Sequence, residues 1–172
     1  GKLTYGSSAT QPQVMGEYFK LLTKTDLLHV RYNGSGAASL AALGGTVDVL
    51  ISSGAGVIPH VASGGLRAIA VLGKERSDAL PDVPTAAEAG YPQLAELGQW
   101  YGYAVPVGTP AAIVNKLNAA IVQSLQDPEV IKGIRAAGMT PAPSTPEEFD
   151  RIIKADYELW GKIVKQTGVK AD

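Results

Sequence analysis

Apolar residues along the first 72 positions of the chain follow two alternating patterns. Short, mostly apolar runs predict strands at residues 3–5, 27–32, 47–51 and 66–72. Between these runs, apolar side chains recur with a helical period, which predicts helices at residues 10–22, 35–43 and 57–63. The run at 47–51 is almost wholly apolar, as expected of a strand in a parallel sheet that is covered on both faces. The alternation therefore predicts an α/β fold with a parallel-rich sheet and flanking helices.

The pattern changes after residue 73. Residues 74–90 are polar and contain Pro81 and Pro84, which predicts a long connection with one helical turn near 85–89. Residues 99–107 are aromatic and read as a strand. Helical periods then occupy residues 109–125, 127–138 and 145–164. The last of them opens on a capping box made by Thr145 and Glu148.

This change of pattern predicts a boundary near residue 95. We expect residues 1–95 to form a complete α/β ligand-binding lobe. Residues 96–172 hold about one predicted strand and three predicted helices, whose apolar stripes have too little sheet to cover. We therefore expect residues 96–172 to be a crossover strand and C-terminal helices that belong to another lobe, incomplete within this chain.

Composition excludes several classes of function. The 172 residues carry 15 Lys and Arg against 16 Asp and Glu, a net charge of −1. Nucleic-acid binding and a polybasic membrane anchor both need a basic excess, so neither is expected. The chain has no cysteine, which excludes disulfides, thiolate metal sites and cysteine nucleophiles. No apolar run approaches the roughly 20 residues that a membrane-spanning helix needs.

Three turns rich in glycine and hydroxyl side chains follow the first three predicted strands, at residues 6–10, 32–36 and 52–56. Ligands of open parallel sheets bind outside the carboxyl ends of the strands, where the next helices begin. Backbone N–H groups and hydroxyls at helix starts favour an anion without any formal positive charge. The alternative is that Gly and Ser serve here only as turn and cap residues.

Other candidates for chemistry carry weaker signals. His29 and His60 lack the spacing of a paired metal site, so neither a metal nor another cofactor is expected. No nucleophile elbow is present, and a hydrolase that uses Ser7 or Ser8 would lack a general base nearby in the sequence. Asp48 lies between two valines, which predicts a buried carboxylate with a structural hydrogen-bonding role.

The densest cluster of aromatic residues lies at positions 99–103. One interpretation of this cluster is a cleft wall or a crossing between lobes. The other interpretation is ordinary core.

The order of short blocks along the chain resembles the substrate-binding receptors of tripartite tricarboxylate transporters, the Bug family. The sharpest block is LPDVPTAAEAG at residues 80–90. The other blocks are GKLTYGSS (1–8), HVRYNGS (29–35), GGTVDV (44–49), LRAIAV (66–71), WYG (100–102), VGTP (107–110), LQDPEV (125–130) and STPEEF (144–149). The resemblance covers essentially the whole chain.

The resemblance implies a periplasmic-binding-protein-like (type II) α/β lobe together with the C-terminal remainder of a second lobe. It implies an exported, typically periplasmic receptor that captures a small organic carboxylate, performs no chemistry on it and hands it to membrane transporter subunits. The ligand-binding residues that it implies lie in the same three turns: Ser7, Ser8, Ala9, Thr10, Gly34, Ser35, Ser52 and Ser53.

Two departures from the family pattern matter. Family members begin with a signal peptide and a first lobe, to which nothing in this chain corresponds, so we expect the later part of a receptor with weak affinity by itself. Many relatives carry an Asp where this chain has Ser52, so a ligand without an amino group is favoured. The alternative function is that of an interaction or oligomerising module, which would associate through the apolar faces of the C-terminal helices.

Overall fold

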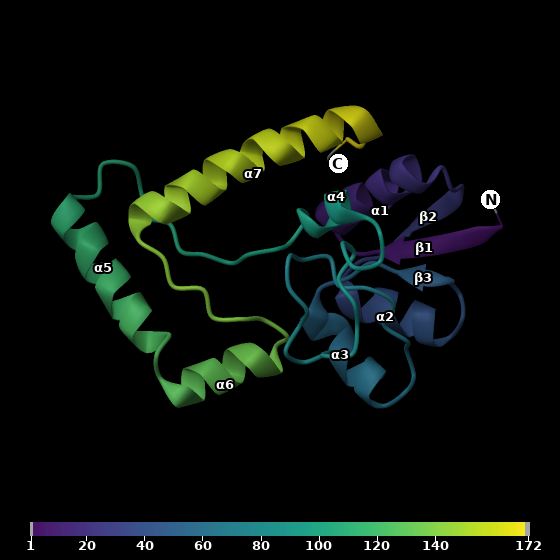
Figure 1. Ribbon diagram of the computed structural model, residues 1–172, viewed down its shortest axis with the longest axis horizontal. Coiled ribbons are helices and arrows are strands. Elements are labelled where there is room, and N and C mark those ends of the chain that lie inside the picture. Colours follow the sequence, from purple (N-terminus) through teal and green to yellow (C-terminus); the bar gives the residue numbers. More distant parts are fainter. Residues whose placement is uncertain (1, 171–172) are drawn as a thin grey trace.

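The computed structural model describes residues 2–170; residue 1 of the first expected lobe and residues 171–172 of the second lie outside it. Three strands form one parallel sheet in the order β2-β1-β3: β1 (Leu3–Ser7), β2 (Leu27–Arg31) and β3 (Val49–Leu50). Because β1 is central and all three strands run the same way, their carboxyl ends meet at one edge of the sheet (Figure 1).

Each of these strands leads directly into a helix, as predicted. The helices are α1 (Thr10–Thr23), α2 (Ser35–Leu43) and α3 (Gly54–Ala62). Four further helices follow: α4 (Pro92–Ala95), α5 (Ala111–Ser124), α6 (Pro128–Ala136) and α7 (Pro146–Thr167). The capping box at the start of α7 is confirmed, because Thr145 and Glu148 exchange both hydrogen bonds. The α/β fold class with a parallel sheet is confirmed as well.

Two predicted strands are wrong. Residues 66–72 form no ladder; only Val71 makes an isolated parallel bridge, to Thr85. A strand needs a neighbour that takes up its backbone groups, and here that neighbour is the 84–86 turn rather than the sheet. The apolar side chain of Ile69 is accordingly left 71% exposed. Residues 99–107 form no strand either, because no strand within residues 2–170 runs beside them.

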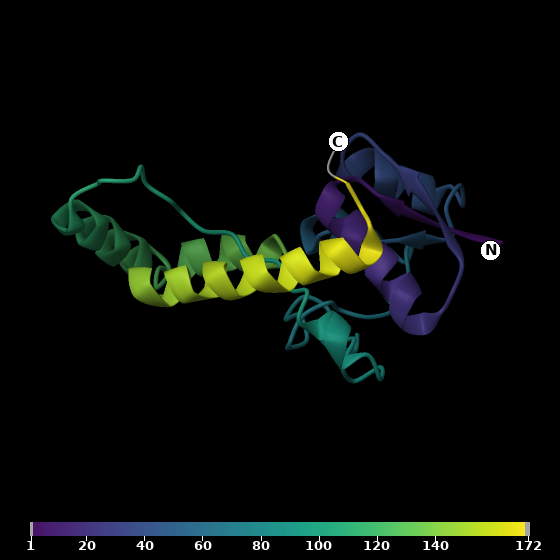
Figure 2. The same cartoon turned by 90° about the horizontal axis from the view of Figure 1, so that it is seen from above.

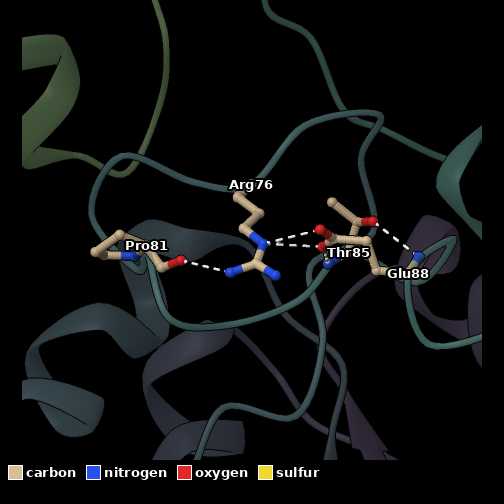
Figure 3. Close-up of polar contacts among 4 residues, drawn as sticks. All are labelled: Arg76, Pro81, Thr85 and Glu88. Carbon is tan, nitrogen blue, oxygen red and sulfur yellow. Dashed lines mark hydrogen bonds and ion pairs between the residues drawn. The ribbon is translucent and has the colours of Figure 1, made fainter.

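The connection at residues 74–90 is folded around one ion pair (Figure 3). Arg76 Nε donates to both carboxylate oxygens of Glu88, at 3.1 and 2.9 Å, and its Nη1 donates to the Pro81 carbonyl at 3.0 Å. These bonds to Arg76 hold the pKa of Glu88 below its usual range. The predicted helical turn is present, because the Ala89 N–H donates to the Thr85 carbonyl at 3.1 Å.

Asp48 has the predicted structural role but not the predicted burial. Its carboxylate accepts hydrogen bonds from the Thr4 N–H and the Thr4 hydroxyl, both at 2.8 Å. These bonds from Thr4 lower the pKa of Asp48. The side chain is exposed, because it lies just before β3 rather than inside it. Asp48 therefore fastens the approach to β3 onto β1.

The hydrophobic core lies on the α1 side of the sheet. Val14 and Met15 of α1 pack there with Leu94 of α4, with Leu97 and with Ile163 of α7. Figures 1 and 2 both show the carboxyl-terminal end of α7 lying against α1. A helix from the last part of the chain thus completes the core of the first part.

The rest of the C-terminal region projects away from the sheet, and we call it the arm: residues 99–158, with α5, α6 and the first half of α7 (Figures 1 and 2). Many of its large apolar side chains are exposed. They include Trp100, Tyr101, Tyr103, Val105, Val107, Ile113, Leu117, Val130, Met139, Ile152, Ile153 and Tyr157. The reading of the 99–103 cluster as ordinary core is therefore wrong, since Tyr103 is 80% exposed.

One close approach fixes α1 on the sheet. The Tyr5 ring is fully buried beneath Gly16, where a Cβ atom would overlap it. The Tyr5 hydroxyl donates to Glu17 Oε1 at 2.7 Å and to the Gln13 carbonyl at 3.2 Å. Burial raises the pKa of Tyr5 far above its ordinary value, and the hydrogen bond to Glu17 adds to this effect.

We predict that Gly16→Ala lowers the free energy of unfolding by about 1–3 kcal/mol, because the added methyl group overpacks the Tyr5 ring. The matched control is Gly133→Ala on α6, where an added Cβ meets no atom within 4 Å. That change should raise stability by about 0.5–1 kcal/mol, since alanine favours the helix. Urea unfolding of both variants measures the difference. Equal stability of the two would contradict the packing described here.

Candidate functional site

The three predicted turns lie together at the carboxyl edge of the sheet. The Tyr32 N–H donates to the Ser7 carbonyl at 2.9 Å, which ties the second turn to the end of β1. The Ile51 N–H donates to the Gly6 carbonyl at 3.0 Å, which ties the third turn there as well. The turn that follows β1 therefore lies between the other two. Together the three turns form one continuous edge, which we call the carboxyl rim.

The second and third turns approach each other at Gly56. A Cβ atom placed on Gly56 would lie 3.1 Å from Ser52 Oγ and 3.4 Å from Ser35 Cβ, so both serine side chains border this glycine. The Ser39 hydroxyl donates to the Gly56 carbonyl at 2.9 Å and holds α3 against α2. The small residues at 54–56 allow this approach. The glycine-rich turn at 52–56 was predicted from the sequence, although Gly56 itself was not among the predicted site residues.

The three helices that begin at the carboxyl rim have no side-chain caps. Ala9, Gly34 and Ser53 are the N-cap residues of α1, α2 and α3, and none makes a side-chain cap hydrogen bond. Away from the rim, Asp127 and Thr145 cap α6 and α7, whereas α4 and α5 have no side-chain cap either. What distinguishes the rim is that three such helix starts lie at one edge of the sheet. The first N–H groups of a helix have no partner within the helix, and the helix dipole adds positive potential there. The rim is suited to an anion for this reason.

Ser52 and Gly34 each have a feature that is relevant to ligand binding at the rim. Ser52 Oγ is buried and finds no hydrogen-bond partner among the residues that the structure describes. A buried hydroxyl without a partner is costly. Because this oxygen is enclosed, a ligand would reach it only after a shift of the third turn. Gly34 has φ 98°, a left-handed conformation that favours glycine, so the turn into α2 depends on this residue. Ser8 and Thr10 are half-buried in the first turn, and Ala9 is exposed.

Ser7 differs from the other predicted residues. Its side chain is 1% exposed and faces the α1 side of the sheet. Ser7 Oγ shares a hydrogen bond of 2.8 Å with His29 Nε2, and the His29 ring lies 4.8 Å from the Tyr5 ring. Burial lowers the pKa of His29. The Ser7 hydroxyl therefore belongs to the fold, and only its backbone reaches the carboxyl rim.

This pair bears on the hydrolase hypothesis. The sequence offered no base near Ser7, whereas β2 brings His29 beside it in space. A nucleophile must reach its substrate, and the Ser7 hydroxyl is enclosed. The Ser7–His29 pair is therefore a structural contact.

A second concave surface lies beside the start of α1, and sequence reasoning did not select it. It is a groove of about 550 Å³, lined by Gln11, Trp100, Asp156, Tyr157 and Trp160 among others. Gln99 Nε2 donates to Oε1 of the lining residue Gln11 at 2.7 Å, and the Trp100 indole N–H donates to Asp156. Its walls are mainly apolar side chains of α7. Trp100 of the aromatic cluster lines this groove, whereas Tyr101 and Tyr103 are exposed. The interpretation of the cluster as a cleft wall or a crossing between lobes stays a prediction.

No group of three His, Cys, Asp or Glu side chains that could hold a metal ion occurs within residues 2–170. No helix in the same span is long and apolar enough to cross a membrane.

The chain has the fold of periplasmic solute-binding proteins, and the parallel sheet with three helices starting at its carboxyl rim is part of that fold. The structure of a periplasmic transporter superimposes on all of this chain with a TM-score of 0.86 and 44% sequence identity. This chain covers 58% of that protein. The structure of Rpa4515 from R. palustris with adipate matches 97% of this chain with a TM-score of 0.79 and 29% identity, and 56% of Rpa4515 is covered.

The sequence places the chain in one family within this class. Residues 1–169 match the tripartite tricarboxylate transporter family receptor, and the chain belongs to that family. Protein BugT of Bordetella pertussis is 35% identical over 172 residues, which are 99% of this chain and 52% of BugT. The predicted resemblance is thereby confirmed. The chain spans about half the length of the curated relatives it matches.

We predict that alanine lowers the free energy of unfolding at Ser7 but not at Ser52. Ser7→Ala leaves His29 without its hydrogen-bond partner and should cost about 1–2 kcal/mol of unfolding free energy. Ser52→Ala removes a hydroxyl without a partner and should be neutral or slightly stabilising. Thermal unfolding of both variants checks this prediction. A large loss of stability in Ser52→Ala would show that its hydroxyl already has a structural partner.

Proposed function

We propose that this chain captures a small organic carboxylate at the carboxyl rim, as part of an extracytoplasmic receptor that delivers its solute unchanged. The observation that carries the proposal is the meeting of three uncapped helix starts at one rim. A carboxylate accepts hydrogen bonds only, and the rim offers donors. Membership in a family of transport receptors supports capture without chemistry.

Each turn has a role in this proposal. The backbone N–H groups of Ser8, Ala9 and Thr10 face one side of the ligand, at the start of α1. Gly34 gives the chain the conformation that exposes the start of α2, and Ser35 adds a hydroxyl. Ser52 and Ser53 supply the donors of the third turn. Ser7 supports the rim through its carbonyl, which accepts from the Tyr32 N–H, while its hydroxyl is held by His29.

The proposed ligand carries no amino group. The third turn presents Ser52, a neutral donor, where an aspartate in relatives would balance an ammonium group. A rim with donors on several sides fits a ligand that has a carboxylate at each end. A dicarboxylate is therefore the favoured class. The presence of adipate in the structure of the related Rpa4515 is in keeping with this choice.

We also propose the division of the chain at residue 95. Residues 1–95 would then supply the sheet and the carboxyl rim of the ligand-binding lobe, although Leu97 and the end of α7 are needed to complete its core. The rest of residues 96–172 would contribute to a second lobe that faces the carboxyl rim. The projecting arm and its exposed apolar side chains support this division. Closure of two lobes over a carboxylate would exclude water from the rim and strengthen its hydrogen bonds.

The cellular setting follows from the same proposal. A receptor of this family would work in the periplasm and present its closed form to the membrane subunits of the transporter. Self-association through the arm stays a prediction.

We predict that adipate binds the chain with millimolar affinity, about −4 kcal/mol, because donors from one lobe alone hold it. Titration followed by ¹H–¹⁵N NMR should shift the amide signals of residues 8–10, 34–35 and 52–54. Adipamide, the neutral analogue, should leave these signals in place, since the rim selects negative charge.

The variant that tests the third turn is Ser52→Ala. It should weaken adipate binding about 10-fold or more, as expected for loss of a hydrogen bond to a charged group, without loss of stability. Ser63→Ala, at the far end of α3, is the matched control and should bind as the wild type does. Shifts confined to the groove beside α7 would contradict the proposed site.

A further inference from the structure

The C-terminal region contacts the helices around the sheet at two places, one large and buried and the other small and exposed. The first is the packing of α7 on α1, in which Ile163 is 2% exposed and part of the core. The second lies at the opposite end of the carboxyl rim, where the end of α6 meets the start of α3 (Figure 1). The proposed binding site lies between them.

The second contact brings two glycines together that are far apart in the sequence. A Cβ atom on Gly54 would lie 3.4 Å from the Gly138 carbonyl oxygen and 3.6 Å from Gly138 Cα. A Cβ atom on Gly138 would overlap the end of the Ile58 side chain. Gly138 has φ 74° and ends α6, with the Met139 N–H returning to the Ile134 carbonyl at 3.1 Å. Backbone therefore lies close to backbone at this contact. An alanine at Gly54 would make ordinary contact with Gly138, whereas the positive φ of Gly138 favours glycine.

An ion pair supports this contact. Arg135 Nε, in the last turn of α6, lies 3.4 Å from Asp78 Oδ2 on the 74–90 connection. Both side chains are more than half exposed, at 58% and 56%. Exposed pairs contribute little to stability, so this contact can open without disturbing the core.

The contact is placed to act on ligand binding. Gly54 is the first residue of α3 and follows Ser52 and Ser53 directly, so whatever holds Gly54 also holds the third turn of the site. The core contact of α7 lies beside α1, at the other end of the rim. The arm is therefore joined to the rest of the chain by the core at α7 and by the α6 contact at the third turn.

We propose that the end of α6 is a clasp for the carboxylate site, formed by Gly138 on Gly54 and by Arg135 with Asp78. The clasp holds the third turn in the conformation that binds the carboxylate, and this part rests on the proposed function. Pre-ordering a turn removes its entropic cost from binding. By linkage, a carboxylate at the rim favours the closed clasp by the same factor.

The test uses two spin labels. The chain has no cysteine, so labels at Ala62→Cys on α3 and Lys132→Cys on α6 are the only two, and both positions are exposed. Pulsed electron resonance then measures the distance between α6 and α3. The doubly labelled wild type should show one main distance and a small population at longer distances.

Charge reversal probes the clasp without any ligand. Asp78→Arg and Arg135→Asp each place like charges together and should increase the longer-distance population about two- to fivefold. The double variant D78R/R135D restores opposite charges and should return the distribution to that of the wild type. Asp82→Arg, in the same connection, is the matched control and should change nothing. Single variants that leave the distances unchanged, or a double variant that stays open, would overturn the clasp.

Adipate tests the coupling. Saturating adipate should reduce the longer-distance population, and Asp78→Arg should weaken adipate binding two- to fivefold, with recovery in the double variant. Binding seen by NMR with no change in distance would overturn the coupling and leave the proposed function standing. If adipate does not bind at all, the proposed function and the coupling both fail, whereas the charge-reversal result still decides whether the clasp exists.

Discussion

β1 is the strand on which the carboxyl rim depends. Both neighbours pair with it in parallel, so the chain must return to the same end of the sheet through a helix each time. The bonds from Tyr32 to Ser7 and from Ile51 to Gly6 continue this pairing beyond the ladders. Three helices consequently start side by side. In the proposed site, the first N–H groups of these helices would hold negative charge without any basic side chain.

The need to keep this rim in place explains several features of the lobe. Tyr5 sits beneath Gly16 and fixes α1, and Ser39 bonded to Gly56 fixes α3 against α2. The Ser7 hydroxyl is used within the sheet, where it joins β1 to His29 of β2. Hydroxyl groups at the rim thus divide into those that hold the structure and those, such as Ser52, that have no partner within the described chain.

Local patterns predicted the elements that depend on local information. The three βα units, the capping box at Thr145 and the turns at the carboxyl rim all follow from period, cap and glycine signals. The strand at 66–72 failed because an apolar run does not reveal whether a partner strand is available. The predicted burial of Asp48 was wrong for a related reason. Its valine neighbours do not reveal that β3 starts only after Asp48.

Contacts between distant parts of the chain were beyond prediction from the sequence. His29 lies 22 residues from Ser7, and nothing in either segment indicates that they share a hydrogen bond. The groove beside α7 and the approach of Gly138 to Gly54 likewise arise only when the arm returns to the sheet. The sequence therefore predicted most of the rim, but not the structures that flank it.

The position of a bound carboxylate tests this account most directly. Crystals of the chain soaked in adipate should show one carboxylate within hydrogen-bond distance of the N–H groups that open α2 and α3, with Ser52 Oγ donating to it. Adipate bound only in the groove between α7 and Trp100, with the starts of α1, α2 and α3 contacted by nothing but water, would contradict the central claim.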